Sequence, residues 1–213
     1  MLNVQAFPFN KFQENTYIVS DESGHCAIFD PGMSNVDEET LFLSYIQENK
    51  LTPIALYNTH CHVDHVLGNQ FIFEQYGLVP QFHELEIPIL VAVQNIAPAY
   101  GFRYEGSRIP DIFLQEGQVI SIGGHILKIL FVPGHSPGHL CFYSAQENFL
   151  IGGDVLFWNS IGRTDLPGGN HQQLLDHIQQ QLYVLPDNTL VYPGHGPSTT
   201  IGFEKQTNPF IRG

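Results

Sequence analysis

Cationic side chains are scarce in this sequence. Lys and Arg together number 8 against 21 Asp and Glu, so the formal net charge is −13 at pH 7. A surface of this sign repels nucleic-acid phosphates and anionic lipid headgroups. We therefore expect no nucleic acid and no membrane among the partners. Bound cations would offset part of this negative charge.

Long apolar runs, repeats and low-complexity tracts are also missing. No stretch reaches the roughly 20 apolar residues that span a bilayer, and we expect no secretory signal, because residues 1–5 lack its basic region and no long apolar region follows. The three cysteines, Cys26, Cys61 and Cys141, lie far apart and form no CxxC pair. We interpret them as buried small hydrophobic residues in a reducing compartment, most simply the cytoplasm.

What remains is the composition of a folded chain. Hydrophobic residues make up 43%, which argues against intrinsic disorder, and no Pro/Gly/Ser-rich linker divides the sequence. We expect a single domain over 1–213. Apolar patterning predicts strands at 2–7, 16–20, 26–29, 54–57, 119–122, 125–132, 139–144, 148–151 and 190–192. It predicts helices at 36–49, 68–76, 84–96 and 170–182. This order indicates a mixed α and β fold with helices on sheet faces, in one sheet or two.

The segment most informative about chemistry is His60-Cys61-His62-Val63-Asp64-His65. Three imidazoles and a carboxylate follow a predicted strand within six residues, and these groups are the usual ligands of zinc, iron and manganese. His60 and His62 suit one metal, while Asp64 and His65 lie one turn onward and suit a second. Cys61 would then point into the fold. A polar loop with incidental histidines is the alternative, and four ligand-type residues at this spacing argue against it.

A six-residue loop cannot close two metal sites alone. Three further ligand-type residues follow predicted strands, each flanked by Gly or Pro turns that fix the direction of a side chain: His135, Asp154 and His195. Each taken singly is a turn residue as often as a ligand, but together they indicate further ligands. The other histidines lack such settings, and we interpret them as surface or core residues: His25, His83, His125, His139, His171 and His177. Of these, His139 is a candidate neighbour of the ligands.

The pattern His60-x-His62-x-Asp64-His65, followed by His135, Asp154 and His195, resembles the metal-binding set of the metallo-β-lactamase fold superfamily. The order of these residues matches along the whole chain, as does the early turn Asp30-Pro31-Gly32. Within the superfamily, segments 153–157 and 162–169 resemble the glyoxalase II-like (hydroxyacylglutathione hydrolase-like) enzymes. The likeness is to their short bacterial form, which lacks the C-terminal helical extension.

This resemblance implies an α+β fold, a four-layer αββα sandwich with metals at one edge. It implies two divalent metal ions per chain, zinc in the first place, with iron or manganese as alternatives. The implied ligands form two trios: His60, His62 and His135 for one ion, and Asp64, His65 and His195 for the other. Asp154 would bridge the two ions, and Asp64 would also orient the attacking hydroxide.

The implied activity is hydrolysis of a small-molecule thioester, such as S-lactoylglutathione, by a hydroxide held between the metals. β-Lactamases of the commonest group carry a Cys near the place of Asp154 and no His at position 65, so antibiotic hydrolysis is not expected. Arg163 stands where glyoxalase II has a lysine that holds glutathione. It either binds a substrate carboxylate or pairs with Asp165 to fix its loop.

Three other functions compete with this interpretation. Persulfide dioxygenases share a segment like 162–165 and hold a single iron through residues corresponding to His60, His135 and Asp154. A nuclease of the superfamily is disfavoured by the net charge of −13. A non-catalytic metal-binding protein is disfavoured by the bridging carboxylate, because inert metal sites are usually closed and four-coordinate.

Overall fold

The computed structural model describes residues 1–213, and the first half of the chain builds one sheet with the order β1-β2-β3-β4-β5. Its strands are β1 (Asn3–Phe9), β2 (Glu14–Ser20), β3 (His25–Phe29), β4 (Thr52–Tyr57) and β5 (Pro80–Gln81). β1, β2 and β3 pair antiparallel, whereas β3, β4 and β5 pair parallel. Parallel neighbours end at the same edge, so the loops that follow β3 and β4 emerge side by side.

The second half builds a six-stranded sheet with the order β13-β12-β9-β8-β7-β6. Its strands are β6 (Val119–Ile122), β7 (His125–Phe131), β8 (Leu140–Ser144), β9 (Phe149–Gly153), β12 (Leu190–Pro193) and β13 (Thr199–Thr200). β9 and β12 pair parallel, and the other pairs are antiparallel. A separate ribbon joins β10 (Leu156–Phe157) to β11 (Ser160–Ile161).

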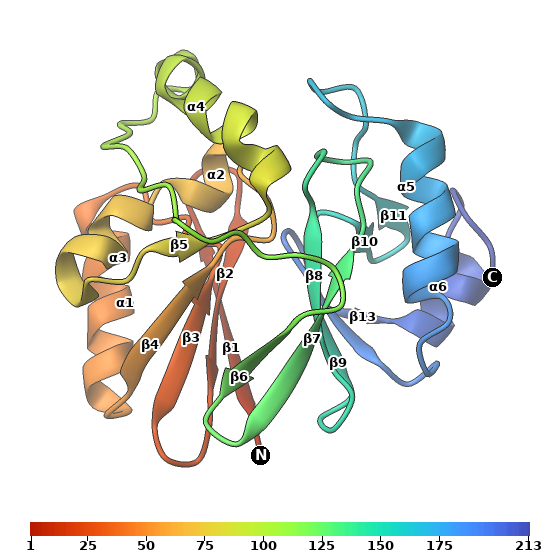
Figure 1. Ribbon diagram of the computed structural model, residues 1–213, viewed down its shortest axis with the longest axis horizontal. Coiled ribbons are helices and arrows are strands. Elements are labelled where there is room, and N and C mark those ends of the chain that lie inside the picture. Colours follow the sequence, from red (N-terminus) through yellow and green to blue (C-terminus); the bar gives the residue numbers. More distant parts are fainter.

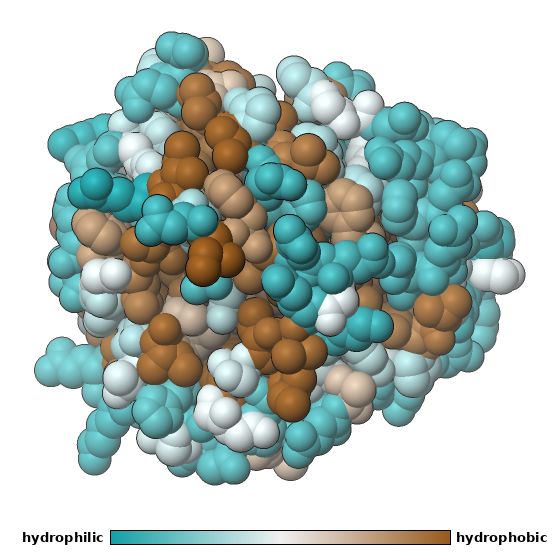
Figure 2. Space-filling view, viewed as in Figure 1, coloured by the Kyte–Doolittle hydropathy of each residue, from teal (hydrophilic) through white to brown (hydrophobic).

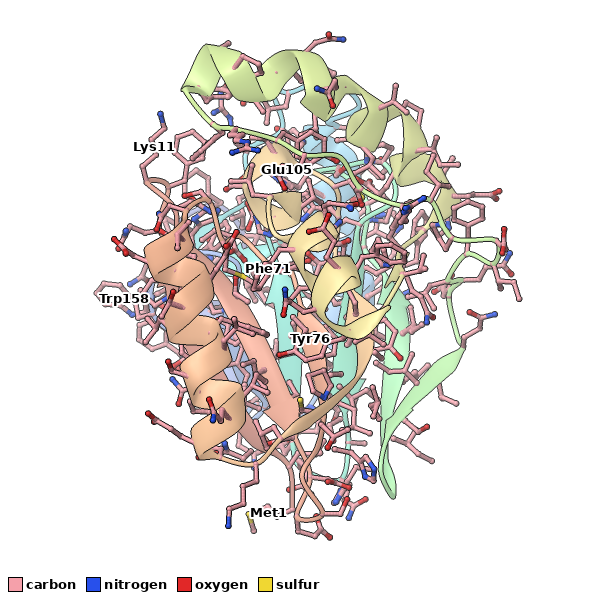
Figure 3. The ribbon with its side chains drawn as sticks, turned by 90° about the vertical axis from the view of Figure 1, so that its left-hand side faces the viewer. Met1, Lys11, Phe71, Tyr76, Glu105 and Trp158 are labelled. Atoms are coloured by element: carbon pink, nitrogen blue, oxygen red, sulfur yellow. The ribbon has the colours of Figure 1, made fainter.

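Helices cover the outer face of each sheet (Figure 1). α1 (Val36–Glu48) and α3 (Asn69–Tyr76) lie across the first sheet, as the side view shows (Figure 3). α5 (His171–His177), its π-helical continuation Ile178–Leu182, and α6 (Ile201–Thr207) cover the second sheet. The two sheets face each other between these helices, which confirms the predicted four-layer αββα sandwich. No helix has the length and apolar character needed to cross a membrane.

The core has three layers because both faces of each sheet are covered. In β7, Leu127 and Ile129 pack between the sheets, whereas Leu130 packs toward α5, as the period-2 geometry of a strand requires. Between the sheets, the ring of Phe142 lies 5.0 Å from that of Phe29 and 5.5 Å from that of Tyr57, centroid to centroid. Strands covered on both faces are apolar nearly throughout, which is why they were predictable from the sequence.

The structure corrects several predicted elements. The predicted helix 84–96 begins as a 3-10 turn at Glu84–Glu86, becomes α4 (Ile87–Ile96) with a proline in its first turn, and ends in a second 3-10 turn, Ala97–Tyr100. Patterning missed α2 (Val63–Val66), α6, β5, β13 and the β10–β11 ribbon. These elements have two to seven residues, too few for a period to be recognised.

Replacing Phe142 by Ala should lower the free energy of unfolding by about 3–5 kcal/mol, because the removed ring leaves a cavity between two rigid sheets. Urea unfolding followed by circular dichroism measures this change. Ile126→Ala is the control, because Ile126 lies on the adjacent strand β7 and is 57% exposed. A loss for Phe142→Ala no larger than for the control would contradict the placement of Phe142 in the core.

Candidate metal centre

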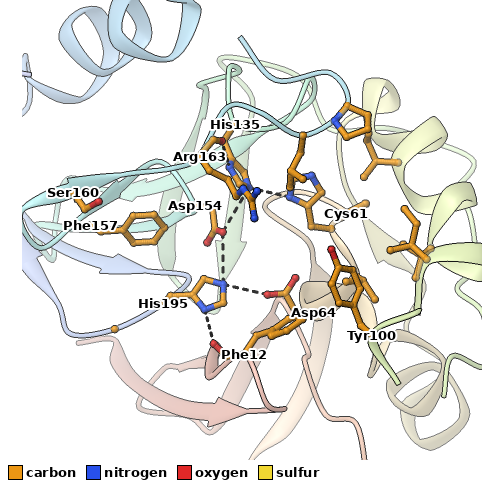
Figure 4. A pocket seen from close by; sticks show the side chains of 18 of the residues that line it. Phe12, Cys61, Asp64, Tyr100, His135, Asp154, Phe157, Ser160, Arg163 and His195 are labelled. Carbon is orange, nitrogen blue, oxygen red and sulfur yellow. Dashed lines mark hydrogen bonds and ion pairs between the residues drawn. The ribbon is translucent and has the colours of Figure 1, made fainter. Parts of the chain in front are cut away.

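Seven ligand-type side chains converge at the edge where strands of both sheets end. Four of them follow β4: His60 and His62 lie in the loop, and Asp64 and His65 lie on α2. The other three follow strands of the second sheet: His135 after β7, Asp154 after β9 and His195 after β12. The structure thus brings all seven predicted residues together (Figure 4 shows His135, Asp154, Asp64 and His195).

His60, His62 and His135 form the first cluster, with one potential ligand atom from each lying within 4.8 Å of the others. His62 Nδ1 lies 2.9 Å from His135 Nε2. The rings are packed almost at right angles, with His60 and His62 centroids 4.7 Å apart. No carboxylate belongs to this trio, so its donor set is three neutral imidazoles.

Asp64, His65 and His195 form the second cluster, again within 4.8 Å of one another. Asp64 Oδ2 lies 3.1 Å from His195 Nε2 and 3.8 Å from His65 Nε2. Val63 and Cys61, the alternate residues of the same segment, are buried in the apolar cluster under α4. The loop therefore divides its side chains between the ligand cluster and the core, as expected from the sequence.

Asp154 lies between the two clusters. Its Oδ1 is 3.5 Å from His65 Nε2, and its Oδ2 is 3.5 Å from His135 Nε2 and 3.6 Å from His195 Nε2. One carboxylate thus reaches histidines of both trios. The backbone approaches closely here, because a Cβ at Gly194 would overlap Asp154 Oδ1, so only glycine fits beside this carboxylate.

Buried polar atoms without partners mark the centre of the cluster. His60 Nε2, His65 Nε2 and Asp154 Oδ1 are buried and form no hydrogen bond. Such atoms are rare in folded proteins and need an explanation. Imidazole nitrogens and carboxylate oxygens facing one another are the donor set of borderline divalent cations, so the residues present fit such ions.

Hydrogen bonds outside the cluster orient its rings. The Nδ1–H groups of His65, His135 and His195 donate to Asp30 Oδ2 (3.2 Å), the Arg163 carbonyl (2.7 Å) and the Phe12 carbonyl (3.0 Å), respectively. In each ring the opposite nitrogen, Nε2, then faces the cluster. This arrangement fixes both the tautomer and the direction of a ligating histidine.

Asp30 organises the first sheet's contribution to the centre. Its carboxylate accepts hydrogen bonds from the Thr59 amide (2.7 Å) and the Thr59 hydroxyl (2.6 Å), besides that from His65. Asp30 also lies within ligand distance of His60 and His65. Since its oxygens already accept these three hydrogen bonds, we interpret Asp30 as a residue that orients the ligand-type side chains and is not itself a ligand. The sequence marked Asp30 only as part of a turn, and its role depends on the parallel pairing of β3 and β4.

The two clusters differ in electrostatics. Burial lowers the pKa of His60 and His135 and lowers the pKa of His62 to about 3, so these rings are neutral. Burial also acts to lower the pKa of His65 and His195, but nearby carboxylates outweigh it and raise both values. Because the carboxylates favour the protonated form of these two rings, a cation entering the second cluster competes with protons there.

Glu86 connects the two ligand loops and was missed in the sequence. This fully buried carboxylate accepts hydrogen bonds from the Cys61 amide (2.7 Å), the Ser136 hydroxyl (2.5 Å) and the Gly138 amide (2.6 Å). Cys61 lies between two ligand-type histidines, and Ser136 follows His135. No local signal distinguishes Glu86, because it lies in an apparently ordinary helical segment beside the exposed Glu84.

His139 and Arg163 lie next to the ligand-type residues and are not members of either trio. His139 is fully buried, its Nε2 accepts from the Asp154 amide (3.0 Å), and its ring stacks on His60. It therefore neighbours the ligand-type residues, as the sequence suggested. The Arg163 guanidinium makes two hydrogen bonds of 2.7 Å to Asp165, so of its two predicted roles the structure contains the ion pair.

A pocket of about 690 Å³ opens onto the cluster. α4 forms one wall, the β10–β11 ribbon forms the opposite wall, and Phe12 lies at the lower rim (Figure 4). Of its 21 lining residues, 11 are hydrophobic. Apolar side chains also gather on the surface over α4 (Figure 2). The arrangement places an apolar slot directly beside a cluster of polar ligand-type groups.

Residues 10–195 match the model of the metallo-β-lactamase superfamily, and the chain belongs to this superfamily. The probable metallo-hydrolase YqgX of Bacillus subtilis is 38% identical over 97% of this chain and 96% of that protein. Hydroxyacylglutathione hydrolase GloC of Haemophilus influenzae is 34% identical over 99% of this chain and 98% of that protein. The chain is therefore a metallo-hydrolase of the superfamily, and the resemblance to its short form is confirmed.

Solved structures share the whole architecture. BLEG-1, a B3 metallo-β-lactamase, superposes with a TM-score of 0.90 at 33% identity over the full length of both chains. TTHA1623, solved in a di-iron-bound form, gives 0.87 at 36% identity and covers 98% of this chain and 100% of its own. ETHE1 from Myxococcus xanthus superposes with a TM-score of 0.78 at 25% identity, and the match covers 97% of this chain and 83% of that chain.

Replacing Glu86 by Gln should destabilise the fold by about 2 kcal/mol. The side-chain NH₂ of Gln is a donor, so it cannot accept the hydrogen bond that a carboxylate oxygen accepts at the same place. Loss of this support should also weaken zinc binding about tenfold. Unfolding in urea and competition with a chromogenic chelator measure the two effects. Glu84→Gln is the matched control on the same 3-10 turn. Equal zinc affinity for both variants would refute the connection between Glu86 and the ligand loops.

Proposed function

We propose that this metallo-hydrolase is a dinuclear, glyoxalase II-like hydrolase of small-molecule acyl-thioesters. The observation that carries the proposal is the convergence of two separate trios with Asp154 between them. A single-metal site needs only one trio, and the second would then be buried without a purpose. The whole-length similarity to hydroxyacylglutathione hydrolase GloC supports the thioester as the bond cleaved.

The proposed ligands follow the two clusters. His60, His62 and His135 would hold one ion, Asp64, His65 and His195 would hold the other, and Asp154 would contact both. We propose zinc as the metal in the first place. Divalent cations held there supply Lewis acidity, which polarises a carbonyl oxygen and lowers the pKa of water toward neutrality. The three cysteines are unpaired and buried, which supports a reducing, cytoplasmic setting.

The chain's own residues then position the reactants. Burial keeps the rings of the first trio neutral, so they act as ligands and not as acids. Asp64 lines the pocket, where its carboxylate can accept a hydrogen bond from the attacking water and orient it. The apolar walls exclude bulk water from the scissile bond. A thiolate leaves without strong acid catalysis because the pKa of its thiol is about 8.5, which explains why no other acid is needed.

His60→Ala and Asp154→Ala should each reduce kcat/KM for S-lactoylglutathione at least about a thousandfold, because each removes a proposed ligand. Steady-state kinetics with zinc-reconstituted protein measures the loss. His25→Ala provides a matched control, since His25 is exposed at the start of β3, far along the strand from the centre. Substantial activity in either ligand variant would rule out the dinuclear mechanism.

Elemental analysis of protein purified without chelator should give about two equivalents of zinc, or of a zinc, iron and manganese mixture, per chain. Asp154→Ala should lower this content, whereas His25→Ala should not. A single equivalent of iron with little else would instead support the persulfide dioxygenase alternative, which the structural neighbour ETHE1 fits.

A β-lactam amide is a second candidate substrate because BLEG-1, a B3 metallo-β-lactamase, is similar over the whole chain. The prediction against antibiotic hydrolysis compared this sequence with the commonest group of β-lactamases, and it does not apply to the B3 group. A chromogenic cephalosporin assayed beside the thioester distinguishes the two. We expect the thioester to be favoured, since its leaving thiolate needs no protonation and the leaving amine does.

A further inference from the structure

We infer that the substrate of this site carries an uncharged apolar acyl group, which lies between α4 and the β10–β11 ribbon. This inference rests on the proposed thioester hydrolysis and specifies its substrate class. Two independent observations lead to it. One is the pair of apolar walls beside the cluster, and the other is the absence of an unpaired cationic side chain among the pocket's lining residues.

The first wall is one face of α4. Ile89, Val93 and Ile96 follow one another at helical spacing and line the pocket. Val93 is buried and fixes the helix on the core, whereas Ile96 is 39% exposed and presents its side chain to the opening. An apolar group bound here would cover surface that otherwise contacts water.

The second wall faces α4 from the ribbon. Phe157 ends β10 and Trp158 follows in the turn, and Trp158 is 55% exposed although it is a large aromatic residue. The ligand-type residues Asp64 and Asp154 line the same pocket. An acyl group whose carbonyl lies at the cluster can therefore reach the apolar walls of the same pocket.

The charges of the pocket disfavour anionic substituents. Arg163 is the only Lys or Arg that lines it, and its Nε and Nη2 donate to Asp165, whose carboxylate offsets the guanidinium charge. Lys11 lies outside the lining residues, over the ring of Phe102. Since Asp64 and Asp154 would bind the metal ions, the walls decide which charges a substituent meets: a carboxylate lying along them would meet no unpaired Lys or Arg, in a chain of net charge −13. An acyl group that carries its own carboxylate should therefore bind less tightly than an alkyl or aryl acyl group.

Thioesters of N-acetylcysteamine test this inference, because the thiol is neutral and only the acyl group changes. With the metal-loaded full chain, kcat/KM should rise about threefold for each methylene added from acetyl to hexanoyl. Succinyl and butyryl thioesters are matched in chain length and differ by the terminal carboxylate. We expect the succinyl thioester to be cleaved at least about tenfold less efficiently. A flat series, or a preference for the succinyl thioester, would overturn the inference.

Variants locate the effect on the slot. Ile96→Ser should reduce the ratio of hexanoyl to acetyl kcat/KM at least about fivefold. Val91→Ser is the matched control, because Val91 lies on the same helix, is 60% exposed and does not line this pocket. An equal ratio in wild type and Ile96→Ser would show that the chain-length dependence does not arise from α4.

A binding measurement separates this inference from the proposed reaction. Trp158 is the only tryptophan of the chain, so its fluorescence reports occupancy of the slot without turnover. N-Acetyl-S-hexylcysteamine should change this emission with a Kd at least about tenfold lower than that of N-acetyl-S-ethylcysteamine, because four more methylenes are buried. If the expected difference in Kd is found but no thioester is cleaved, the apolar binding site is supported and thioester hydrolysis is refuted. If thioesters are cleaved but the hexyl and ethyl ligands bind equally, the proposed function stands and the apolar acyl site is refuted.

Discussion

The burial of imidazole and carboxylate groups together at the sheet edge is the constraint on which the rest of the structure depends. Three of their polar atoms have no hydrogen-bond partner, and such atoms are costly to bury. The surroundings hold them in place nonetheless. Asp30 supports His65 from the first sheet, backbone carbonyls hold His135 and His195, and Glu86 joins the two ligand loops. The fold keeps this arrangement because cations favour the same convergence of donors.

Much of this centre was predictable from the sequence, for a physical reason. The ligand-type residues follow apolar strands that are covered on both faces, so both the strands and the turns after them leave clear patterns. Asp30 and Glu86 left no such pattern. Each acts through partners distant in sequence, Thr59 and His65 for Asp30, and Cys61, Ser136 and Gly138 for Glu86. The short elements β5, β10, β11 and α6 were missed because a period cannot be recognised in so few residues.

The pocket combines a polar floor with apolar walls. Its floor is polar and holds Asp64 and Asp154, while its walls are the apolar face of α4 and the aromatic side chains of the β10–β11 ribbon. The walls come from short or irregular segments, which vary more readily than sheet strands. Substrate choice in this fold can therefore change without altering the strands that position the ligand-type residues.

The clustered residues come from both halves of the chain, four from the first and three from the second. His62 and His135, for example, meet although 73 residues separate them. An ion held between such residues acts as a cross-link that closes long loops and restricts the unfolded ensemble. Cation supply would then set the folded population of the protein as well as its rate, since a ligand that binds only the native state stabilises it by mass action. Where such cations are scarce, a smaller fraction of the protein would be folded.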